Sequence, residues 1–431
     1  MGIGGSAASG IAQIAAAQGW QVTGCDKESD TPYLDKAKAA GIETFVGHDA
    51  AHIIDADIVA VSPALLYQNA DHPEMRAARD AGKLMTWQQF LGDYLHKDKY
   101  VICITGTHGK STTTAMTGLV LEDAEMDPTV EVGATVPAWH NNIKVGRGKY
   151  FITEADEFNS NFLHYHPDVI ILNNIEMDHP EYFKTEENML KIFQQFISQL
   201  KPEGTLIYNS DSPLVHKLTL PEHAIAYAAS EYSEAHFPLA VHGAHNRTNA
   251  LGVIALARML NIPDDTTAQA LTRFSGIGRR VELLGEKNTI RVYDDYANHP
   301  TAFAASIATV REIHAASAKS SDVPKPSGKI WAVIEPHTYS RLRAVLPILP
   351  LSVTHADYVI VSKIFASRES DPGDFSGTDI VSFMNHPHAR YILDFPTIID
   401  TIKKEATLGD SILVMGSGDS YKLAREILAA L

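Results

Sequence analysis

The sequence predicts an α/β fold in which three domains are each built around a mostly parallel β-sheet. Short apolar runs that suit buried strands alternate with helix-compatible segments along most of the chain. At residues 105–113 one such strand leads through a glycine turn directly into a helix start. The chain has 431 residues, of which 45% are hydrophobic, which is too long for one core and indicates two or three domains.

The composition and net charge indicate which partners and which compartment suit this protein. A formal net charge of −16 argues against nucleic acid or an acidic membrane as the main partner. There is no apolar run of about 18 residues, as a membrane span requires, and no signal peptide. We therefore expect a soluble, cytoplasmic monomer or homodimer. Cys25 and Cys103 lie in apolar runs and are expected to be buried free thiols.

Residues 1–97 are predicted to form an N-terminal Rossmann-like domain. A glycine cluster at residues 2–10 is followed about 20 residues later by Asp26, as in loops that bind a dinucleotide. A strand should lead into this cluster, yet Met1 directly precedes it, so we expect the natural start to lie upstream. The expected elements are a helix at 11–18 and strands at 20–25 and 57–61.

Residues 98–279 are predicted to form a central domain of the P-loop ATPase type. The expected strands are residues 100–104, 150–152 and 169–172, and the expected helices are 114–121, 249–260 and a short one ending at Phe274 with Asp265 as its N-cap.

Residues 280–431 are predicted to form a C-terminal Rossmann-like domain. Strands are expected at residues 289–295, 329–334, 356–362 and 411–415, with helices between them. Residues 315–328 are rich in Ala, Ser, Lys and Pro and are expected to form a solvated loop.

The stretch from Thr105 to Thr113 is the strongest functional signal. A strand, a glycine turn and a helix start direct backbone N–H groups at an anion. Lys110 can contact the β- and γ-phosphates of a nucleotide, and the Ser111 hydroxyl can bind Mg²⁺. The first glycine of the usual phosphate-loop pattern is missing, so a plain glycine turn with a solvated lysine is the alternative.

Polar and acidic groups follow two further predicted strands, at residues 154–157 and 173–180. Ligands bind at such strand ends in open α/β sheets. The carboxylates and the imidazole of His179 suit a Mg²⁺–nucleotide site, because Mg²⁺ prefers oxygen ligands and tolerates an imidazole. A solvated loop carboxylate is the alternative for Glu154.

The third domain carries similar strand-end groups. Arg279 and Arg280 can reach phosphates across a domain cleft, or form an ordinary solvated pair. The loop at 294–300 can hold a ribose, or be a turn capped by Asp. The loop at 335–341 can bind a carboxylate through an arginine fork. Residues 416–419 can contact substrate, although a helix start capped by Asp419 explains them too.

These motifs together resemble those of the Mur ligase family, in the same order and over nearly the whole chain. The residues that carry the resemblance are 2–5, 106–111, 154–157, 178–179, 279–280, 294–296, 299–300, 335–341 and 418–419. In this family the phosphate loop lacks the first glycine. The chain most resembles the members that join L-alanine to UDP-N-acetylmuramate, whereas residues 158–162 and 173–176 favour those that attach a recycled murein tripeptide.

The resemblance implies a role for each matching residue. Those implied to bind ATP are Gly106, Thr107, His108, Gly109, Lys110, Ser111, Thr112, His245, Asn246, Asn249, Arg280 and Asp295. Those implied to bind the UDP-sugar are Gly2, Gly4, Gly5, Ser6, Asp26 and Ser62. His299, His337, Tyr339 and Arg341 are implied to face the amino acid or the sugar carboxylate, and Ser111, Glu154 and His179 to bind Mg²⁺. Lys110, His179, Arg280 and His299 are the expected catalytic residues, and Asn249 is also expected to open its helix.

The implied reaction uses ATP and Mg²⁺ to phosphorylate the lactyl carboxylate of the sugar. The amine of L-alanine then attacks the acyl phosphate. Two other classes remain as alternatives. A nucleotide-binding regulatory protein would keep the loop and release phosphate regardless of UDP-muramic acid. An NAD-dependent oxidoreductase would use only the first glycine cluster and leaves the phosphate loop unexplained.

Overall fold

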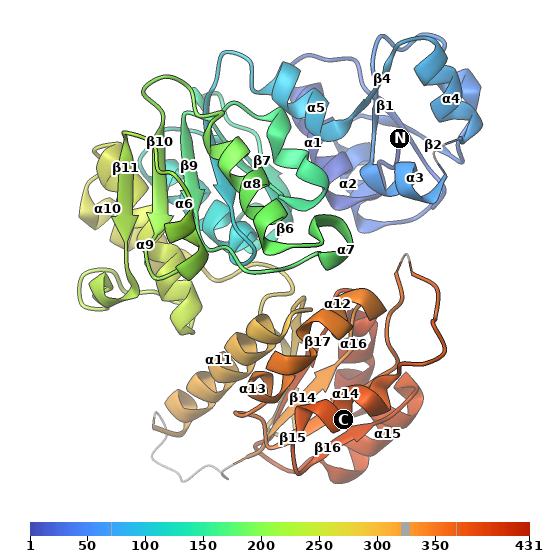
Figure 1. Cartoon of the computed structure of the whole chain (residues 1–431), viewed down its shortest axis with the longest axis vertical. Coiled ribbons are helices and arrows are strands. Elements are labelled where there is room, and N and C mark those ends of the chain that lie inside the picture. The colour runs from blue at the N-terminus through green and yellow to red at the C-terminus, as the bar shows by residue number, and fades with distance from the viewer. Residues whose placement is uncertain (70, 320–327, 368) are drawn as a thin grey trace. The chain divides into compact units, whose positions relative to one another are not determined.

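The structure, a computed structural model, describes residues 1–69, 71–319, 328–367 and 369–431 (Figure 1). It divides into two compact units. The first unit contains Met1–Glu176, Glu187–Ala240 and Thr248–Ser275, and the second contains Met177–Glu186, Val241–Arg247 and Gly276–Leu431. The predicted α/β fold is confirmed in both. No helix among the described residues is long and apolar enough to cross a membrane.

The first unit begins with two pairs of short parallel strands. These are β1 (Thr23–Asp26) with β2 (Glu43–Val46), and β3 (Val59–Val61) with β4 (Leu84–Thr86). The chain start lies between the two pairs, because the Met1 amino group donates to Ala60 O at 2.7 Å and Gly2 N donates to Cys25 O at 2.8 Å. The helices of this part are α1 (Ser6–Ala17), α2 (Pro32–Ala39), α3 (Pro63–Gln68), α4 (Pro73–Asp80) and α5 (Trp87–Phe90), with a 3-10 turn η1 at Ala50–Ile53.

The rest of the first unit is built on a seven-stranded sheet in the order β11-β10-β9-β5-β8-β6-β7, in which only the β6–β7 pair is antiparallel. The strands are β5 (Tyr100–Thr105), β6 (Thr129–Val136), β7 (Asn141–Lys144), β8 (Tyr150–Glu154), β9 (Val169–Leu172), β10 (Thr205–Asn209) and β11 (Ala224–Tyr227). The helices are α6 (Lys110–Asp123), α8 (Glu186–Ile197), α9 (Ala244–Met259) and α10 (Asp264–Arg273). Because β8 and β9 flank β5, their carboxyl ends lie beside the loop that follows β5.

The second unit is built on a six-stranded sheet in the order β12-β13-β17-β14-β15-β16, in which only β12–β13 is antiparallel. The strands are β12 (Glu282–Lys287), β13 (Ile290–Asp295), β14 (Ile330–Ile334), β15 (Tyr358–Val361), β16 (Ala389–Tyr391) and β17 (Ser411–Met415). The helices are α7 (Pro180–Phe183), α11 (Pro300–Lys319), α12 (Tyr339–Val345), α13 (Leu349–Ser352), α14 (Gly377–Met384), α15 (Phe395–Glu405) and α16 (Ser420–Ala430).

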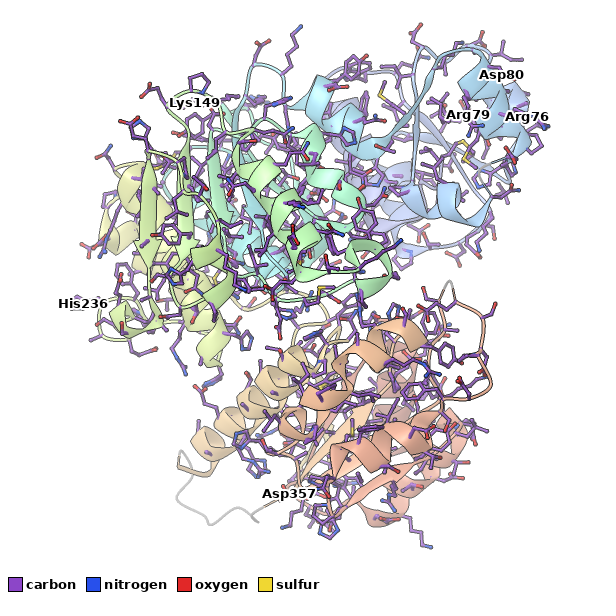
Figure 2. The ribbon with its side chains drawn as sticks, viewed as in Figure 1. Arg76, Arg79, Asp80, Lys149, His236 and Asp357 are labelled. Atoms are coloured by element: carbon purple, nitrogen blue, oxygen red, sulfur yellow. The ribbon has the colours of Figure 1, made fainter. Side chains whose placement is uncertain are left out.

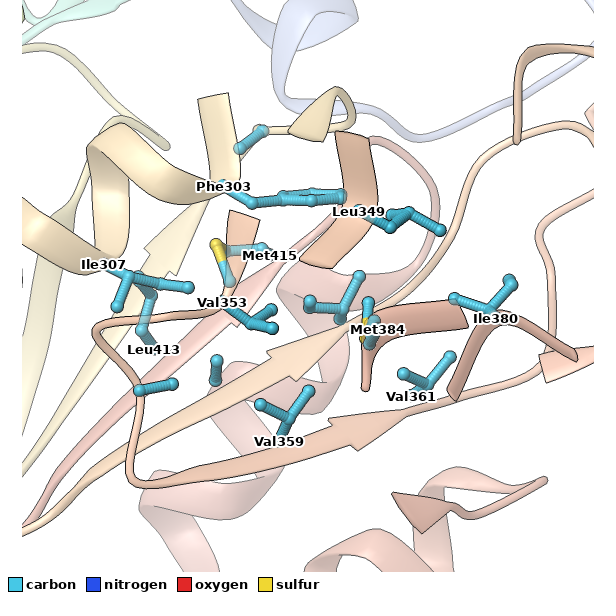
Figure 3. Packing of buried hydrophobic residues seen from close by; sticks show 14 of the residues in the cluster. Phe303, Ile307, Leu349, Val353, Val359, Val361, Ile380, Met384, Leu413 and Met415 are labelled. Carbon is cyan, nitrogen blue, oxygen red and sulfur yellow. The ribbon is translucent and has the colours of Figure 1, made fainter. Parts of the chain in front are cut away.

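Helices cover both faces of this second sheet, which explains why its strands are apolar throughout. Alternate residues of a strand point to opposite faces. Val359 and Val361 of β15 pack with α11, α13 and α14 in one buried cluster, whereas Ile360 between them packs with α15 and α16 in another. Figure 3 shows the first cluster, with Phe303 and Ile307 of α11 above the strands.

Several predicted boundaries are wrong. The first helix starts at Ser6, because the glycine cluster itself forms the turn into it, and the following strand is Thr23–Asp26. Helix α9 starts at Ala244, so Asn249 lies in its second turn and does not open it. Helix α10 starts at Asp264 with Pro263 at its N-cap, so Asp265 is not the cap.

The loop expected at residues 315–328 is wrong in its first part. Helix α11 continues through Lys319, because alanine and lysine have high helix propensity. Residues 320–327 lie outside the described residues.

Candidate active site

The phosphate loop is formed as the sequence predicts. Strand β5 ends at Thr105, the turn contains Gly106 at φ 129° and Gly109 at φ 83°, and α6 begins at Lys110. A Cβ on Gly106 would lie 2.7 Å from Asn174 O, and a Cβ on Gly109 would lie 2.4 Å from Asn249 Oδ1. Only glycine fits both the backbone angles and this spacing. The helix start therefore faces a narrow polar cradle suited to an anion.

Residues after β9 hold this loop in shape. Asn174 Oδ1 accepts from His108 N at 2.9 Å, and Asn174 Nδ2 donates to His108 O at 3.1 Å. The Thr107 hydroxyl donates to Glu176 O and accepts from Glu176 N, each at 2.9 Å. His108 Nε2 lies 3.0 Å from a Glu176 carboxylate oxygen. The strand-end asparagines thus preorganise the loop rather than add charge to it.

Lys110 is held by Glu157, which belongs to the predicted acidic group at 154–157 but was given no role of its own. Its Nζ donates to Glu157 Oε2 at 2.8 Å and to Gly106 O at 2.7 Å. The Glu157 side chain is only 3% exposed and that of Lys110 16%. Burial alone would lower the pKa of the Lys110 ammonium, but the charges of Glu157 and Asp156 raise it. The lysine therefore stays charged at the mouth of the loop.

Asn249 contributes an unsatisfied donor beside the loop. Its side chain is 5% exposed, and among the described residues its Nδ2 has no hydrogen-bond partner. A buried amide donor without a partner costs about 1–3 kcal/mol, so a ligand that accepts from it is favoured. The cradle and this donor together fit a nucleotide phosphate or base.

Two carboxylates lie on the paired strands β6 and β8. Glu154 Oε1 accepts from Gly133 N, and Glu131 Oε2 accepts from Thr153 Oγ1 at 2.8 Å. Burial, together with the charge of Glu154, raises the pKa of the Glu131 carboxyl to about 8. Two carboxylates this close repel each other, and a divalent cation would relieve the repulsion. Glu131 was missed because it lies inside a strand, not after one.

The residues predicted to bind the UDP-sugar lie together in the first unit. Asp26 Oδ2 accepts from Gly4 N at 2.8 Å, and a Cβ on Gly4 would lie 2.8 Å from the same oxygen. Gly5 is the N-cap of α1, so Ser6 begins the helix. Ser62 N donates to Met1 O at 3.2 Å, which brings the end of β3 to the glycine cluster.

In the second unit, Arg341 lies at the centre of a buried polar group. Its Nε is 2.8 Å from Asp178 Oδ1, and its Nη2 lies 3.1 Å from Nε2 and 3.2 Å from Nδ1 of His179. Its Nη1 is 3.4 Å from His337 Nδ1. Burial alone would raise the pKa of the Asp178 carboxyl, but Arg341, His179 and His299 hold it well below its ordinary value.

The other two residues predicted to face a carboxylate are also buried. Tyr339, the first residue of α12, is 6% exposed and packs in a hydrophobic cluster. His299 is 1% exposed, and its Nδ1 accepts from Thr301 N at 3.3 Å near the start of α11. The structure thus gathers Arg341, His337 and His179 closely, and the charge of His299 also acts on the Asp178 carboxyl.

The adjacent arginines have different surroundings. Arg279 is tied into the fold, since its Nε is 3.0 Å from Asp294 Oδ2 and its Nη2 donates to Gly416 O at 2.7 Å. Arg280 is exposed and lies over the Tyr296 ring, 5.5 Å from its centroid. Asp295 is 2% exposed and accepts from the backbone N–H groups of Val281 and Ala297.

We expect the two arginines to give opposite results on mutation. Arg279→Ala should lower the free energy of unfolding by about 2–3 kcal/mol, because charge-assisted hydrogen bonds to Asp294 are lost. Arg280→Ala should change the free energy of unfolding by less than about 0.5 kcal/mol, because its side chain is exposed. It should nevertheless lower turnover, because Arg280 is one of the residues implied to bind ATP. Urea unfolding and ligase kinetics on both variants check this, and equal stability losses would contradict it.

The turn at Gly416–Asp419 differs from the prediction. Asp419 precedes α16 but makes no side-chain cap. Glu335, at the end of β14, accepts instead from Asp419 N at 3.2 Å and from Ser420 N at 3.0 Å. A carboxylate from the neighbouring strand therefore satisfies the helix start, which sequence spacing cannot reveal.

His245 and Asn246 lie in the first turn of α9, and Asn246 Nδ2 donates to His242 O at 2.7 Å. This turn belongs to the second unit, whereas Asn249 of the same helix belongs to the first. The three residues predicted to lie near adenine are thus carried on one helix that is shared by both units.

The fold and the loop after β5 define an α/β protein with a nucleotide phosphate site. Family models match three stretches of the chain: "Mur ligase family, catalytic domain" over residues 1–98, "Mur ligase middle domain" over 104–235, and "Mur ligase, glutamate ligase domain" over 279–418. The chain belongs to the Mur ligase family.

Among its relatives is the UDP-N-acetylmuramate–L-alanine ligase of Alkaliphilus metalliredigens, 34% identical over 100% of this chain and 96% of the relative. The enzyme of the same name from Caldicellulosiruptor bescii is 34% identical over 99% and 97%. A solved structure, the UDP-N-acetylmuramate–alanine ligase of Thermotoga maritima, has a TM-score of 0.79 at 24% identity, covering 99% of this chain and 97% of that one. This last likeness concerns the fold.

Proposed function

We propose that this chain joins L-alanine to the lactyl carboxylate of UDP-N-acetylmuramate, converting ATP to ADP and phosphate. The observation that carries the proposal is full-length identity of 34% to enzymes of that name, combined with an ordered phosphate loop. The proposed division into domains is 1–97 for the UDP-sugar, 98–279 for ATP, and 280–431 for the amino acid and part of the nucleotide.

In the proposed mechanism the loop from Gly106 to Thr112 binds the ATP phosphates. The α6 start directs its free N–H groups toward them, and Lys110 neutralises charge as the γ-phosphate moves to the carboxylate. The Asn249 amide, which needs an acceptor, would donate to the nucleotide. Phosphoryl transfer requires positioning and charge compensation rather than covalent catalysis, which suits this set of groups.

Mg²⁺ fits the oxygen-rich end of β8. Glu154 and the Ser111 hydroxyl, both in the first unit, would hold it. The resemblance implies His179 as a further ligand, and this residue belongs to the second unit. When bound, the ion would draw negative charge from the phosphate oxygens. Glu131, whose carboxyl lies beside Glu154, would orient that ligand.

The chemistry explains why a buried site is needed. A carboxylate is a poor acyl donor, so the γ-phosphate of ATP is first transferred to one of its oxygens. The alanine amine attacks the acyl carbon, phosphate leaves with the C–O bond electrons, and the amine loses its proton. Water would hydrolyse the acyl phosphate, so the surrounding residues must exclude it. Arg341 and His337 would bind a substrate carboxylate, and Arg280 with Asp295 would approach the nucleotide.

A co-substrate assay tests this function. The purified chain is incubated with ATP, Mg²⁺ and UDP-N-acetylmuramate, with either L-alanine or murein tripeptide as acceptor. We expect ADP and the alanyl product to form in equal amounts. Preference for the tripeptide would establish the alternative peptide ligase. Phosphate release that does not respond to the sugar would favour a regulatory nucleotide-binding protein.

Glu154→Gln should raise the Mg²⁺ concentration needed for half-maximal activity roughly tenfold. The amide retains an acceptor for Gly133 N but lacks the charge that would hold the cation. Glu187→Gln is the matched control, because Glu187 is an exposed acid of the same unit paired only to Lys191. An unchanged Mg²⁺ titration in Glu154→Gln would remove this residue from the metal site.

A further inference from the structure

Four side chains with metal-binding atoms meet in the N-terminal part of the first unit. We call Cys25, His48, His52 and Glu74 the Cys25 cluster. Cys25 lies in β1, His48 follows β2, His52 lies in η1, and Glu74 lies in the first turn of α4. None of them belongs to the residues proposed above for ATP, sugar or alanine.

The distances between the donor atoms suit one shared ion. Cys25 Sγ lies 3.2 Å from His48 Nδ1 and 3.2 Å from Glu74 Oε1. The Glu74 carboxylate lies 3.3 Å from His48 Nδ1 and 3.5 Å from His52 Nδ1. Donors arranged tetrahedrally around zinc are about 3.3–3.6 Å apart, given Zn–S of about 2.3 Å and Zn–N of about 2.0 Å. The separations that join Cys25, His48 and Glu74 are close to that value, and the ligand atoms of Cys25, His52 and Glu74 all lie within 4.8 Å of one another.

Burying the Glu74 carboxylate and the other polar atoms of the Cys25 cluster costs folding free energy unless an opposite charge or a hydrogen bond compensates it. Glu74 is 1% exposed and Cys25 3%. Among the described residues His52 Nδ1, which points at the cluster, is buried without a hydrogen-bond partner. A buried carboxylate surrounded by a thiol and imidazoles is unusual in a structural core, because uncompensated charge is expensive there. A divalent cation would compensate it.

The other charged residues of α4 are not buried as Glu74 is. Arg76, Arg79 and Asp80 of the same helix are exposed, and Figure 2 labels them at the edge of the N-terminal part. Glu74, by contrast, lies on the side of the helix that is buried with Met75 and Ala78. A glutamate is thus placed where an apolar residue would ordinarily pack.

We propose that Cys25, His48, His52 and Glu74 bind one zinc ion that ties β1, η1 and α4 together. The donor set selects the metal, since a thiolate with imidazoles suits zinc whereas Mg²⁺ requires oxygen ligands. This site is therefore separate from the proposed Mg²⁺ site in both place and chemistry. It would crosslink β1 to η1 and α4, which lie outside the β1–β2 strand pair.

Without an ion, the thiol is protonated. Burial raises the pKa of Cys25 to about 12, and Sγ–H then donates to Glu74. Zinc would take the place of that proton, which leaves to solvent, and the thiolate would bind the metal. Folding of the three segments around the ion would then be linked to its binding.

Metal binding to the full-length chain tests the proposal directly. The protein is stripped with a chelator, dialysed against Zn²⁺ or Co²⁺, and analysed for bound metal, for thiolate–cobalt absorption and for thermal unfolding. We expect one tightly bound ion per chain, a cobalt–thiolate band, and a higher Tm with zinc. These readouts do not depend on ligase activity, so they remain informative if the proposed function fails.

Cys25→Ser and His52→Ala should each weaken zinc affinity at least ~10-fold and remove the zinc-dependent rise in Tm. His52 is partly exposed, so its loss does not endanger folding. Cys103→Ala, at the other buried thiol, and His236→Ala, at an exposed loop histidine labelled in Figure 2, are the matched controls. Zinc binding that is absent in the parent chain, or unaffected by both cluster variants, would overturn the proposal.

Discussion

Lys110→Met is expected to lower kcat/KM roughly 10³-fold, the largest catalytic effect of any single change considered. Methionine keeps the length of the side chain but removes the charge that would follow the γ-phosphate to the carboxylate. Steady-state ADP formation with saturating sugar and alanine measures the loss. Turnover near that of the parent chain would contradict the assignment of the phosphate loop.

The same change should also destabilise the protein, and the two effects can be separated. Glu157 is 3% exposed and loses its partner, which costs about 3–5 kcal/mol for a buried ion pair that is broken on one side. The double variant Lys110→Met/Glu157→Gln removes both charges and should recover most of that stability while remaining inactive. Recovery of turnover in the double variant would show that Lys110 acts only through stability.

Lys149→Met is the matched control for this experiment. Lys149 is exposed (Figure 2). It lies over the rings of Tyr100 and Tyr150, at 5.6 and 5.1 Å from their centroids. We expect a stability change of no more than about 1 kcal/mol and unaltered kinetics, because only a surface cation–π contact is lost.

Arg341→Ala is expected to destabilise the protein about as strongly as Lys110→Met. The guanidinium is 3% exposed and pairs with Asp178, so its removal leaves a buried carboxylate unpaired at a cost of about 3–5 kcal/mol. It should also raise KM for alanine or for UDP-N-acetylmuramate, since the planar fork suits a substrate carboxylate. Arg341→Lys should recover part of the stability but not the KM, because an ammonium cannot make two parallel hydrogen bonds.

Arg343→Ala tests whether the loss of any arginine from α12 has the same effect as the loss of Arg341. Arg343 lies two residues further along, is 44% exposed and pairs with Asp374 at the surface. The expected cost is less than about 1 kcal/mol, with kinetics unchanged. Equal effects for Arg341 and Arg343 would remove Arg341 from the site.

The Asp178–Arg341 pair also predicts a pH dependence of stability for the ligand-free chain. The pKa of Asp178 is lowered in the folded state from an ordinary value of 3.8, so folding favours its ionised form. The stabilisation is present above that ordinary value and is lost as the pH falls below it. Urea unfolding from pH 6 to pH 3 should show a steeper decline in the parent chain than in Arg341→Ala.

Strands and helices whose pattern is carried by neighbouring residues could be predicted from the sequence. The alternation of apolar runs with helical patterns is sufficient to predict strands such as Val169–Leu172 and Ser411–Met415, which the structure confirms at those bounds. The prediction of a helix start was wrong where a residue distant in the sequence takes the place of a local cap. A cap by Asp419 was one of two interpretations of residues 416–419, yet Glu335, directly after β14, accepts from the N–H groups at the start of α16.

The first observation, a strand followed by a glycine turn and a lysine, could be predicted from the sequence alone, because the glycines, the lysine and the helix start are adjacent in the chain. The family resemblance likewise followed from motifs read in order. Tertiary structure alone decided that Glu157 holds Lys110, that Arg279 is structural whereas Arg280 is exposed, and that Cys25 meets Glu74. Those partners are separated by 15 to 137 residues, so only the packing of strands and helices brings them within hydrogen-bond distance.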